Sequence, residues 1–521
     1  GYYVTSTPTG RSIDDIIEES WNRIVSSGKL NTINEPQSRN DKRDNPSHTH
    51  NHGECASEKW LQEKTKNLKS VDLPRTPLPD PATKQASAHK RTAQPMRFYV
   101  DDSVLRSGQD PAACYSQFQV INIDGNPNKI YTCSSSDLLT DDLLSLITDS
   151  IIPTTLQIFS EVLSVKASEV VNPLSLDLLV YYQYSQQCDY GIPINYSYVN
   201  PGVPNADYIL FVTSRPSDNP NTVAYAGACN YHTYMNGLHS RPFAGFLNLI
   251  PRWFQTYTTS MSLYQYKKAL KIAIHEATHA LGFSSFFYDS FLNSTTAYFY
   301  TQSIWFQSTA TGVAPSGQAY NQTITKLRGP NLLRFARDYF NCNTLDGVEL
   351  EDYGGTGTAG SHWERRVCGE EYMTGFVNDQ MWMSGFTLSL FDDMGWYDVD
   401  RSKAEYIGWG KDQGCGFVQS RCETSWPGSN PGYWCNTTSI TGCTADRVGY
   451  GTCSLYSVSI GAYYQHFPDP AAGGGDVAAD YCPYTPPTVS CRDTGRTAQS
   501  NLFEVYGDTS RCWEVNNGTT S

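Results

Sequence analysis

Two histidines and a glutamate stand at a spacing that suits metal-assisted hydrolysis in residues 271–282, KIAIHEATHALG. On a helix, residues four positions apart lie on one face, about 5.4 Å apart along the axis. His275 and His279 can therefore both direct a ring nitrogen at one ion, and ~2.0–2.1 Å is the usual distance for zinc. Glu276 lies beside His275, where its carboxylate can act as the catalytic base on a water at that ion.

The residues around this motif favour a helix over residues 262–282. Apolar residues such as Ile274 and Leu281 supply a packing face, and Gly282 is a natural helix terminator. Histidines and glutamate also meet at helical spacing by chance, which is the alternative for a bare five-residue match. The apolar flank and the glycine favour the metal site over that alternative.

A catalytic zinc needs a third protein ligand and one open position. The metzincin pattern HExxHxxGxxH would place that ligand at position 285, which is Ser285 in this chain. Either the site is defective or the third ligand comes from elsewhere. Beyond residue 100 the sequence offers four other histidines: His232, His239, His362 and His466.

Strands and helices alternate ahead of the motif helix. Leucine and isoleucine crowd one side of residues 137–152, which predicts a helix. Short apolar runs predict strands at residues 96–100, 208–213 and 245–250. No run approaches the ~18 consecutive apolar residues of a membrane-spanning helix. Beyond residue 403, glycine, proline and cysteine become frequent, so we expect short strands stabilised by disulfides.

Residues 1–92 differ in composition from the rest of the chain. A short helix is predicted at residues 13–25, and polar, proline-punctuated sequence follows it. The dibasic pair Lys90-Arg91 offers a protease a cutting site in a polar linker. These features predict a poorly packed, removable leader that contains a single cysteine, Cys55.

The net charge of −14 is unevenly distributed along the chain. Residues 1–100 carry 15 basic and 12 acidic side chains, whereas residues 101–521 carry 23 basic and 40 acidic ones. A body this acidic repels phosphate backbones, which argues against nucleic acid as a partner. A slightly basic leader suits a segment lying against that acidic body, and a solvated basic linker is the alternative.

Fourteen of the 15 cysteines lie between Cys114 and Cys512, at irregular spacings without the paired CxxC motifs of a zinc ribbon. This pattern predicts disulfides and therefore an oxidising compartment. Five Asn-x-Ser/Thr sites are compatible with a secreted glycoprotein: Asn195, Asn293, Asn321, Asn436 and Asn517.

Five stretches beyond the motif helix carry a resemblance to a known family. They are NCNTLDGVELED (341–352), GGTGTAGSHWE (354–364), EYMTG (371–375), FDDMGWY (391–397) and WGKDQGC (409–415). These stretches resemble the leishmanolysin family, a branch of the metzincin zinc metallopeptidases in which an inserted segment separates the glycine from the third histidine. The resemblance covers roughly residues 96–515.

The resemblance implies an α+β fold in three parts. These are a metzincin-type catalytic domain with a mixed sheet and an active-site helix, an inserted central domain, and a disulfide-rich, mainly β/loop C-terminal domain. We therefore expect a prosegment (1–92), an N-terminal catalytic subdomain with the HExxH helix (93–283), a central subdomain with the third ligand and the Met-turn (284–402), and a Cys-rich C-terminal domain (403–521).

Carried onto this sequence, the resemblance implies that His275, His279 and His362 hold one zinc ion and that Glu276 is the base. It implies that Met373, in the Met-turn, packs beneath the metal as structural support. It also implies local disulfides, for which the pairs are Cys114–Cys133, Cys188–Cys229 and Cys342–Cys415, and it assigns no partner to Cys368.

Cys55 is our candidate for a cysteine switch. Zinc proteases are often kept inactive by a prosegment thiolate that occupies the open metal position, and Cys55 lies in the leader. A merely free or intermolecular thiol is the alternative. His48, His50 and His52 fit a solvated polar loop better than a second metal site.

Together these features predict a zinc metalloendopeptidase that hydrolyses peptide bonds of protein substrates. We expect it to be made as a zymogen and to be secreted or attached to the cell surface. The expected partners are protein or peptide substrates, cell-surface or matrix proteins, and a membrane reached through a processed lipid anchor. The alternative is a surface adhesion protein with a residual metal site, and the two are compatible because the resembled family is also associated with adhesion.

Overall fold

A computed structural model gives the arrangement of the chain. It describes residues 1–4, 10–28, 54–55, 94–123, 129–176, 187–234, 236–259, 261–293, 295–296, 298–353, 358–378, 380–425, 432–493, 495–496, 504–507 and 509–513. For residues 54, 55, 259 and 425 the description covers the backbone alone. The predicted features at His48, His50, His52 and Lys90-Arg91 lie outside these residues.

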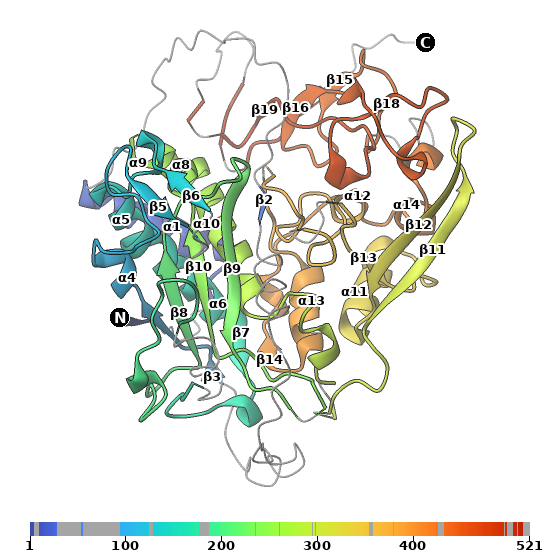
Figure 1. The fold of residues 1–521 in the computed structure, drawn as a ribbon. Helices are drawn as coiled ribbons and strands as arrows, with labels where there is room; N and C mark the ends of the chain where they lie inside the picture. The colour runs from blue at the N-terminus through green and yellow to red at the C-terminus, as the bar shows by residue number, and fades with distance from the viewer. Residues whose placement is uncertain are drawn as a thin grey trace.

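A six-stranded mixed sheet forms the centre of the N-terminal half (Figure 1). The central strands β4, β8 and β10 are parallel to one another, and β9 is antiparallel to β10. In spatial order the strands are β1 (Tyr2–Val4), β4 (Phe98–Asp101), β8 (Tyr208–Thr213), β10 (Ala244–Leu249), β9 (Thr222–Asn230) and β2 (Glu54–Cys55). The strands predicted at 208–213 and 245–250 are thus confirmed as β8 and β10, and the third overlaps β4.

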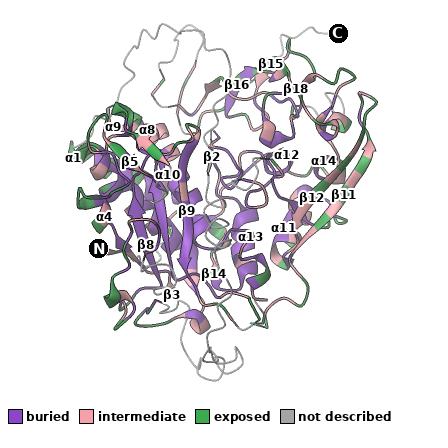
Figure 2. Cartoon of the chain, in the orientation of Figure 1, coloured by how far each residue is buried: buried purple, intermediate pink, exposed green. Residues whose placement is uncertain are grey.

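Both faces of this sheet are covered. Along β8, Tyr208, Leu210 and Val212 join the main core, whereas Ile209 and Phe211 join a second apolar cluster on the opposite face. A strand buried on both faces has no polar side, which explains the uninterrupted run YILFVT. Figure 2 shows the same burial along β8, β9 and β10.

Helices pack on the main-core face of the sheet. The motif helix α10 (Leu263–Ala280) contacts β9 and β10, and α6 (Ile152–Val162) contacts α10. The helix predicted at 137–152 is displaced: α5 (Asp141–Leu146) begins later, and one π-helical turn, Ile147–Ile151, carries it into α6. By length and composition Asp141–Val162 could cross a membrane, but 72% of its apolar window is buried in the protein, as in a core helix.

The prediction of a poorly packed leader was wrong for the helix α1 (Ile13–Ser27), which is packed against the body of the protein. Its apolar face, which includes Ile16, Ile17 and Trp21, is buried in the main core against α6 and α10. Ser20 shares a buried hydrogen-bonded group with Tyr266 of α10 at 2.7 Å. The apolar period of the helix was visible in the sequence, but the polar stretch that follows it concealed that this face has a partner.

The central part of the chain contributes a hairpin and a helix pair, shown at the right of Figure 1. Strands β11 (Trp305–Val313) and β12 (Ala319–Leu327) form the hairpin, and β13 (Val348–Glu349) pairs with the end of β12. Helices α11 (Pro330–Phe340) and α13 (Gly385–Met394) pack on each other, and β14 (Tyr397–Val399) pairs with β7 (Leu163–Val165) of the N-terminal half. The segment with His362 lies between β13 and α12 (Arg365–Cys368).

The C-terminal part has short strands and few helices, as its glycine, proline and cysteine content predicts. Its strands are β15 (Thr441–Cys443), β16 (Gly449–Thr452), β17 (Leu455–Ser457), β18 (Ala472–Gly474) and β19 (Val489–Ser490). Other short elements of the described chain are β3 (Gln94–Pro95), α4 (Ser103–Arg106), β5 (Val120–Asn122), β6 (Ile130–Thr132), α8 (Pro251–Phe254), α9 (Thr256–Thr259) and α14 (Cys415–Gln419).

Six disulfides join twelve cysteines of the described residues. Three are the pairs that the resemblance implies, Cys114–Cys133, Cys188–Cys229 and Cys342–Cys415. Three more cross-link the C-terminal part: Cys422–Cys482, Cys435–Cys453 and Cys443–Cys512. Cys368 is buried and forms no disulfide with a described residue. The fold is thus α+β with several disulfides.

Candidate metal centre

Helix α10 places its two histidines on one buried face. The helix begins at a capping box, in which the Ser262 hydroxyl accepts from the backbone N–H of Gln265 and the Gln265 side chain accepts from the N–H of Ser262. Beyond its last turn, Gly282 has a φ of +126°, and an added Cβ there would lie 2.8 Å from the Trp396 ring. Glycine at this position therefore lets the chain leave the helix beside His279.

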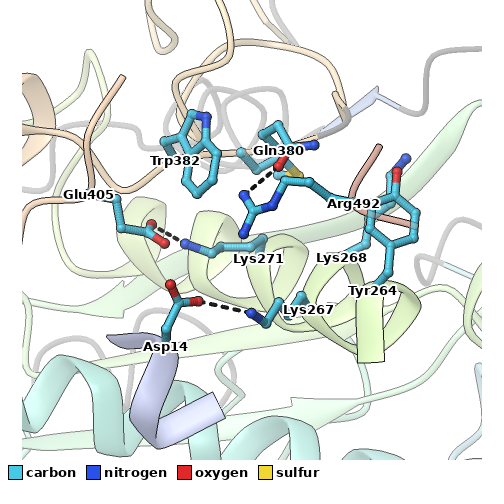
Figure 3. A pocket seen from close by; sticks show the side chains of 10 residues that line it. Asp14, Tyr264, Lys267, Lys268, Lys271, Gln380, Trp382, Glu405 and Arg492 are labelled. Atoms are coloured by element: carbon cyan, nitrogen blue, oxygen red, sulfur yellow. Dashed lines mark hydrogen bonds and ion pairs between the residues drawn. The ribbon is translucent and has the colours of Figure 1, made fainter. Parts of the chain in front are cut away.

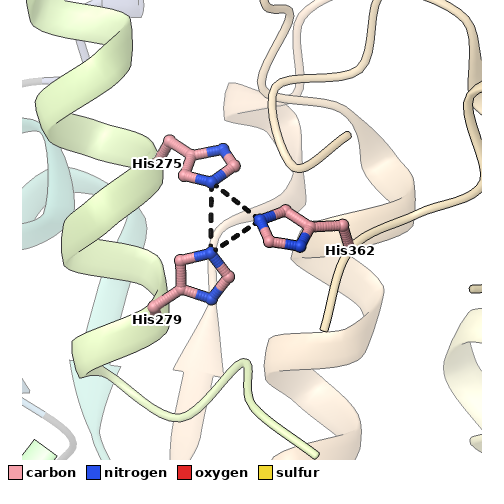
Figure 4. A group of neighbouring side chains, drawn as sticks. All are labelled: His275, His279 and His362. Carbon is pink, nitrogen blue, oxygen red and sulfur yellow. Dashed lines mark hydrogen bonds between the residues drawn. The ribbon is translucent and has the colours of Figure 1, made fainter. Parts of the chain in front are cut away.

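Three imidazoles meet at one point. The Nε2 atoms of His275 and His279 are 3.1 Å apart, and the Nε2 of His362 lies 3.2 Å from the first and 3.1 Å from the second. Figure 4 shows the three rings converging, two from the helix and one from the segment before α12. All three residues are at most 2% exposed. The structure therefore brings the histidine that the resemblance implies, 83 residues beyond His279, to the motif helix.

Each imidazole is held through its other nitrogen. The Nδ1–H groups of His275, His279 and His362 donate to the backbone carbonyl oxygens of Tyr372, Phe283 and Thr358, at 2.5, 2.7 and 2.9 Å. A carbonyl oxygen can only accept, so the proton of each neutral ring is on Nδ1. Each Nε2 must then present a lone pair to the other two.

Burial favours the neutral form of all three rings. Desolvation lowers the pKa of His275 and His362 well below the ordinary range and that of His279 to about 4, and the neighbouring imidazoles lower the first two further. Three lone pairs directed at one point repel one another unless a cation lies between them. The electrostatics of the centre therefore call for a metal ion.

The donor set fits zinc. Two nitrogens bound to one tetrahedral zinc at ~2.0–2.1 Å are about 3.3 Å apart, close to the 3.1–3.2 Å found here. Three neutral imidazoles, each oriented by a hydrogen bond from Nδ1, are the usual ligands of a catalytic zinc with one remaining position. Glu276 follows His275 in the same helix turn and is fully buried.

The turn with Met373 supports the ligands through its backbone. The Trp363 N–H, next to His362, donates to the Met373 carbonyl oxygen at 2.9 Å, and the Tyr372 carbonyl holds His275. Met373 itself is fully buried in the main core. This turn therefore touches both the helix and the third-histidine segment, which are separate in the sequence.

Glu371 organises this turn, and sequence reasoning missed it. Its carboxylate accepts from the Met373 N–H at 2.5 Å and from the hydroxyls of Ser384 and Thr387 at 2.8 and 2.6 Å. It is fully buried, and burial raises its pKa to about 7 although these donors lower it. The only sequence signal was a glutamate two residues before Met373. Its partners on α13 become visible only in the fold.

The other three histidines that the structure describes lie apart from this centre. His466 is buried in the C-terminal part, where its Nδ1 lies 2.7 Å from Glu423 and its Nε2 lies 2.7 Å from the Asp480 carbonyl oxygen. His239 stacks on Phe286 with ring centroids 4.4 Å apart, and burial lowers its pKa to about 4. His232 packs edge-on against Phe243. Of Cys55 the backbone alone is described: β2 pairs parallel to β9, with Cys55 opposite Ala224.

A charged cluster lies on α10 ahead of His275 (Figure 3). Asp14 of the leader helix pairs with Lys267 at 3.1 Å, and Lys271 pairs with Glu405. The Glu405 carboxylate also accepts from the Met383 N–H at 2.7 Å. These contacts join the leader helix, the motif helix and the stretch beyond the Met-turn around a small pocket.

Comparisons with known proteins point to one family of peptidases. The family model described as Peptidase_M8: Leishmanolysin matches residues 42–519. Among curated proteins, the leishmanolysin homolog of Crithidia fasciculata is 29% identical over 412 residues, which are 77% of this chain and 57% of that protein. Leishmanolysin of Leishmania major is 27% identical over 398 residues (75% and 60%), and the leishmanolysin-like peptidase of Drosophila melanogaster 29% over 371 (60% and 53%).

The chain spans less than two thirds of the length of these relatives. The family model nevertheless matches most of the chain, including the motif helix, His362 and the turn with Met373. We conclude that this chain belongs to the leishmanolysin family of zinc metallopeptidases.

Proposed function

We propose that the chain is a zinc-dependent metalloendopeptidase of metzincin type that hydrolyses peptide bonds of protein substrates. The observation that carries the proposal is the meeting of three neutral imidazoles whose Nε2 atoms lie 3.1–3.2 Å apart and present their lone pairs to one point. His275, His279 and His362 would hold the zinc. A bound zinc supplies Lewis-acid activation of the carbonyl and of the attacking water.

Glu276 is the proposed base in this reaction. Its carboxylate would take the proton of the attacking water and pass it to the leaving amine nitrogen. Its place beside His275 in a rigid helix turn fixes it relative to the metal ligands, and its full burial keeps competing water away from the carboxylate. The Met373 turn would act only by holding His275 and the His362 segment in register.

We also propose the domain boundaries that follow from this function: a prosegment at 1–92, catalytic subdomains at 93–283 and 284–402, and a Cys-rich domain at 403–521. The prosegment proposal is supported by strand β2, whose backbone pairs with the edge of β9 at Thr222 and Ala224. An extended substrate would use a free strand edge in the same way. A leader that occupies this edge, with the Cys55 thiolate as the fourth zinc ligand, would make the chain a zymogen.

An extracellular location, secreted or at the cell surface, is the proposed setting. Six disulfides among the described residues need an oxidising compartment to form and persist. The sequons at Asn195, Asn293, Asn321, Asn436 and Asn517 would then be available for glycosylation. Attachment through a lipid anchor and adhesion to cell-surface or matrix proteins belong to the same proposal.

The deciding experiment combines metal analysis with cleavage of a protein substrate. Full-length protein, secreted and processed, is measured for zinc per chain and then incubated with denatured casein. One zinc per chain and cleavage that a zinc chelator abolishes are expected. A processed, zinc-loaded chain that cleaves no protein would instead support the adhesion protein with a residual metal site.

A further inference from the structure

Three carboxylates meet beside the third-histidine segment, outside the zinc centre. Glu351 and Asp352 follow β13, and Glu364 lies two residues after His362. The bridge between Leu350 and Trp363 brings the two segments together, and one oxygen of each carboxylate lies within 4.8 Å of the others. Glu351 and Glu364 are 1% and 2% exposed, whereas Asp352 is partly exposed.

One oxygen of this group is buried and has no hydrogen-bond partner among the described residues. Glu351 Oε1 accepts from the Tyr353 N–H at 2.9 Å, but its Oε2 is buried and has no hydrogen-bond partner among the residues that the structure describes. A buried carboxylate oxygen with no donor loses its hydration without compensation. This atom therefore points to a ligand that satisfies it.

The neighbouring arginines do not neutralise the group. Arg366 pairs with Glu349 and Asp480, and Arg365 pairs with Asp476 and Glu370. Within the described parts of the chain, Glu351, Asp352 and Glu364 form no ion pair. The three carboxylates thus converge without an ion pair of their own among the described residues, and the two arginines beside them pair with other carboxylates.

Neutral groups donate hydrogen bonds to three other oxygens of the group. Asp352 accepts from the Tyr464 hydroxyl and from the Gln322 amide, each at 2.8 Å, and Glu364 accepts from the Arg366 N–H at 2.9 Å. A carboxylate oxygen has two lone-pair positions, so these bonds do not prevent coordination. Burial, followed by the charge of Asp480, raises the pKa of Asp352 to about 6, which reflects the cost of gathering anions here.

We propose that Glu351, Asp352 and Glu364 bind a calcium ion. All three ligands are hard carboxylate oxygens, which calcium prefers and zinc does not require. Calcium accepts about 6–8 oxygen ligands in a flexible geometry, so carboxylate oxygens that lie within 4.8 Å of one another can surround it. Magnesium requires a near-ideal octahedron and usually keeps several waters, which suits it less to a largely buried group of protein carboxylates.

The ion would join the segment that contains His362 to the segment that follows β13. The Glu351 N–H donates to the His362 carbonyl oxygen at 2.9 Å, and the Gly360 N–H donates to the Glu351 carbonyl oxygen at 2.9 Å. Calcium bound by Glu351 from one segment and by Glu364 from the other would add a cross-link to these backbone hydrogen bonds. The site thus supports the position of His362 without taking part in the chemistry.

Calcium binding can be measured without peptidase activity. Full-length protein is passed over a chelating resin, given one equivalent of zinc, and titrated with terbium and then with calcium chloride. Tyr464 contacts Asp352, so excitation of aromatic side chains should produce terbium emission that calcium displaces. We expect one saturable site with a Kd on the order of 10⁻⁴–10⁻³ M, as in extracellular calcium modules.

Substitutions locate the ion. Asp352→Asn and Glu351→Gln should each weaken calcium binding roughly tenfold or more, because each removes one anionic ligand. Asp346→Asn is the matched control, since Asp346 lies close by in the sequence, is half-exposed and pairs with Lys326. Equal loss in that control would indicate nonspecific binding and overturn the proposal.

Two further results would also overturn it. The first is unchanged binding in Asp352→Asn, a partly exposed position at which the variant is expected to fold even if Glu351→Gln does not. The second is a pair of observations: calcium does not change the melting temperature of the parent chain, and Glu351→Gln raises it. That outcome would mean that the carboxyl groups share protons instead of a cation. Zinc content, measured in parallel, separates a failure of this site from a failure of the zinc centre.

Discussion

The Nδ1–H of His275 donates to the carbonyl oxygen of Tyr372 at 2.5 Å. The two residues are 97 positions apart, and the bond fixes the orientation of a proposed metal ligand from outside its own helix. Such contacts through the second ring nitrogen set the tautomer and raise the basicity of a ligand. We therefore expect the motif helix to bind a metal ion only when the turn that follows His362 is in place.

Glu276→Gln should retain zinc and lose peptidase activity. The amide has nearly the same shape as the carboxylate but cannot accept a proton from water, so kcat should fall by ~10²–10⁴. Zinc per chain and casein cleavage are measured on the same preparation. Turnover comparable to that of the unsubstituted enzyme would remove Glu276 from the role of base.

His362→Ala should lose zinc as well as activity, because two imidazoles leave the metal with too few protein ligands. His466→Ala is the control: this histidine is equally buried but bonds to Glu423 and to the Asp480 carbonyl. Its loss should lower the melting temperature and leave one zinc per chain. If zinc disappears from the His466 variant and stays in the His362 variant, the third ligand is misassigned.

Glu371 should make stability depend on pH. Burial raises its pKa to about 7 from an ordinary 4.5, so between these values the folded chain holds a proton that the unfolded chain has released. Its contribution is complete below about pH 4.5 and is lost as the pH rises through 7. The melting temperature of Glu371→Gln relative to the unsubstituted chain should therefore rise over this range, and parallel profiles would contradict the assignment.

Cys55→Ser should yield a precursor that is active before processing, because a serine hydroxyl is a much weaker zinc ligand than a thiolate. The measurement compares casein cleavage by the unprocessed variant and the unprocessed parent at equal zinc content. A latent variant would show that the leader blocks the cleft by its bulk, without help from the thiol.

Gly282→Ala should destabilise the chain and weaken zinc binding. The φ of +126° disfavours alanine, and its Cβ would meet the Trp396 ring at 2.8 Å, which displaces the carbonyl of Phe283 from His279. Gly317→Ala separates the two causes, since its φ is +86° but no atom lies within 4 Å of the added Cβ. The control should cost about 1–2 kcal/mol of folding free energy and leave zinc bound. Equal losses of zinc in both variants would rule out the packing explanation.

Local pattern predicted the elements whose surroundings are simple. The run YILFVT became β8 at the expected residues because a strand covered on both faces needs no polar alternation. Residues 262–282 became the motif helix because an apolar face and a terminating glycine agreed. The helix predicted at 137–152 was displaced because the chain continues through a π-helical turn to Val162. An apolar pattern that repeats every 3.6 residues does not predict such a turn.

The centre itself needed more than local pattern. Spacing alone identified His275, Glu276 and His279. It left four histidines as candidates for the third metal ligand, since His362 lies in an irregular segment. The resemblance pointed to it. The EYMTG stretch contains Glu371 but did not reveal its role, because the hydroxyls that donate to it lie 13 and 16 residues further along the chain.

The buried leader helix has a consequence for what a cut would release. Five apolar side chains of this helix are at most 8% exposed: Ile13, Ile16, Ile17, Trp21 and Ile24. Removing each from water contributes about 1.5–3 kcal/mol to the free energy that holds the helix in place. Cleavage of the linker at Lys90-Arg91 would therefore not free the fragment. We expect the clipped protein to persist as a two-chain complex, from which the small chain leaves only when it is itself degraded or displaced.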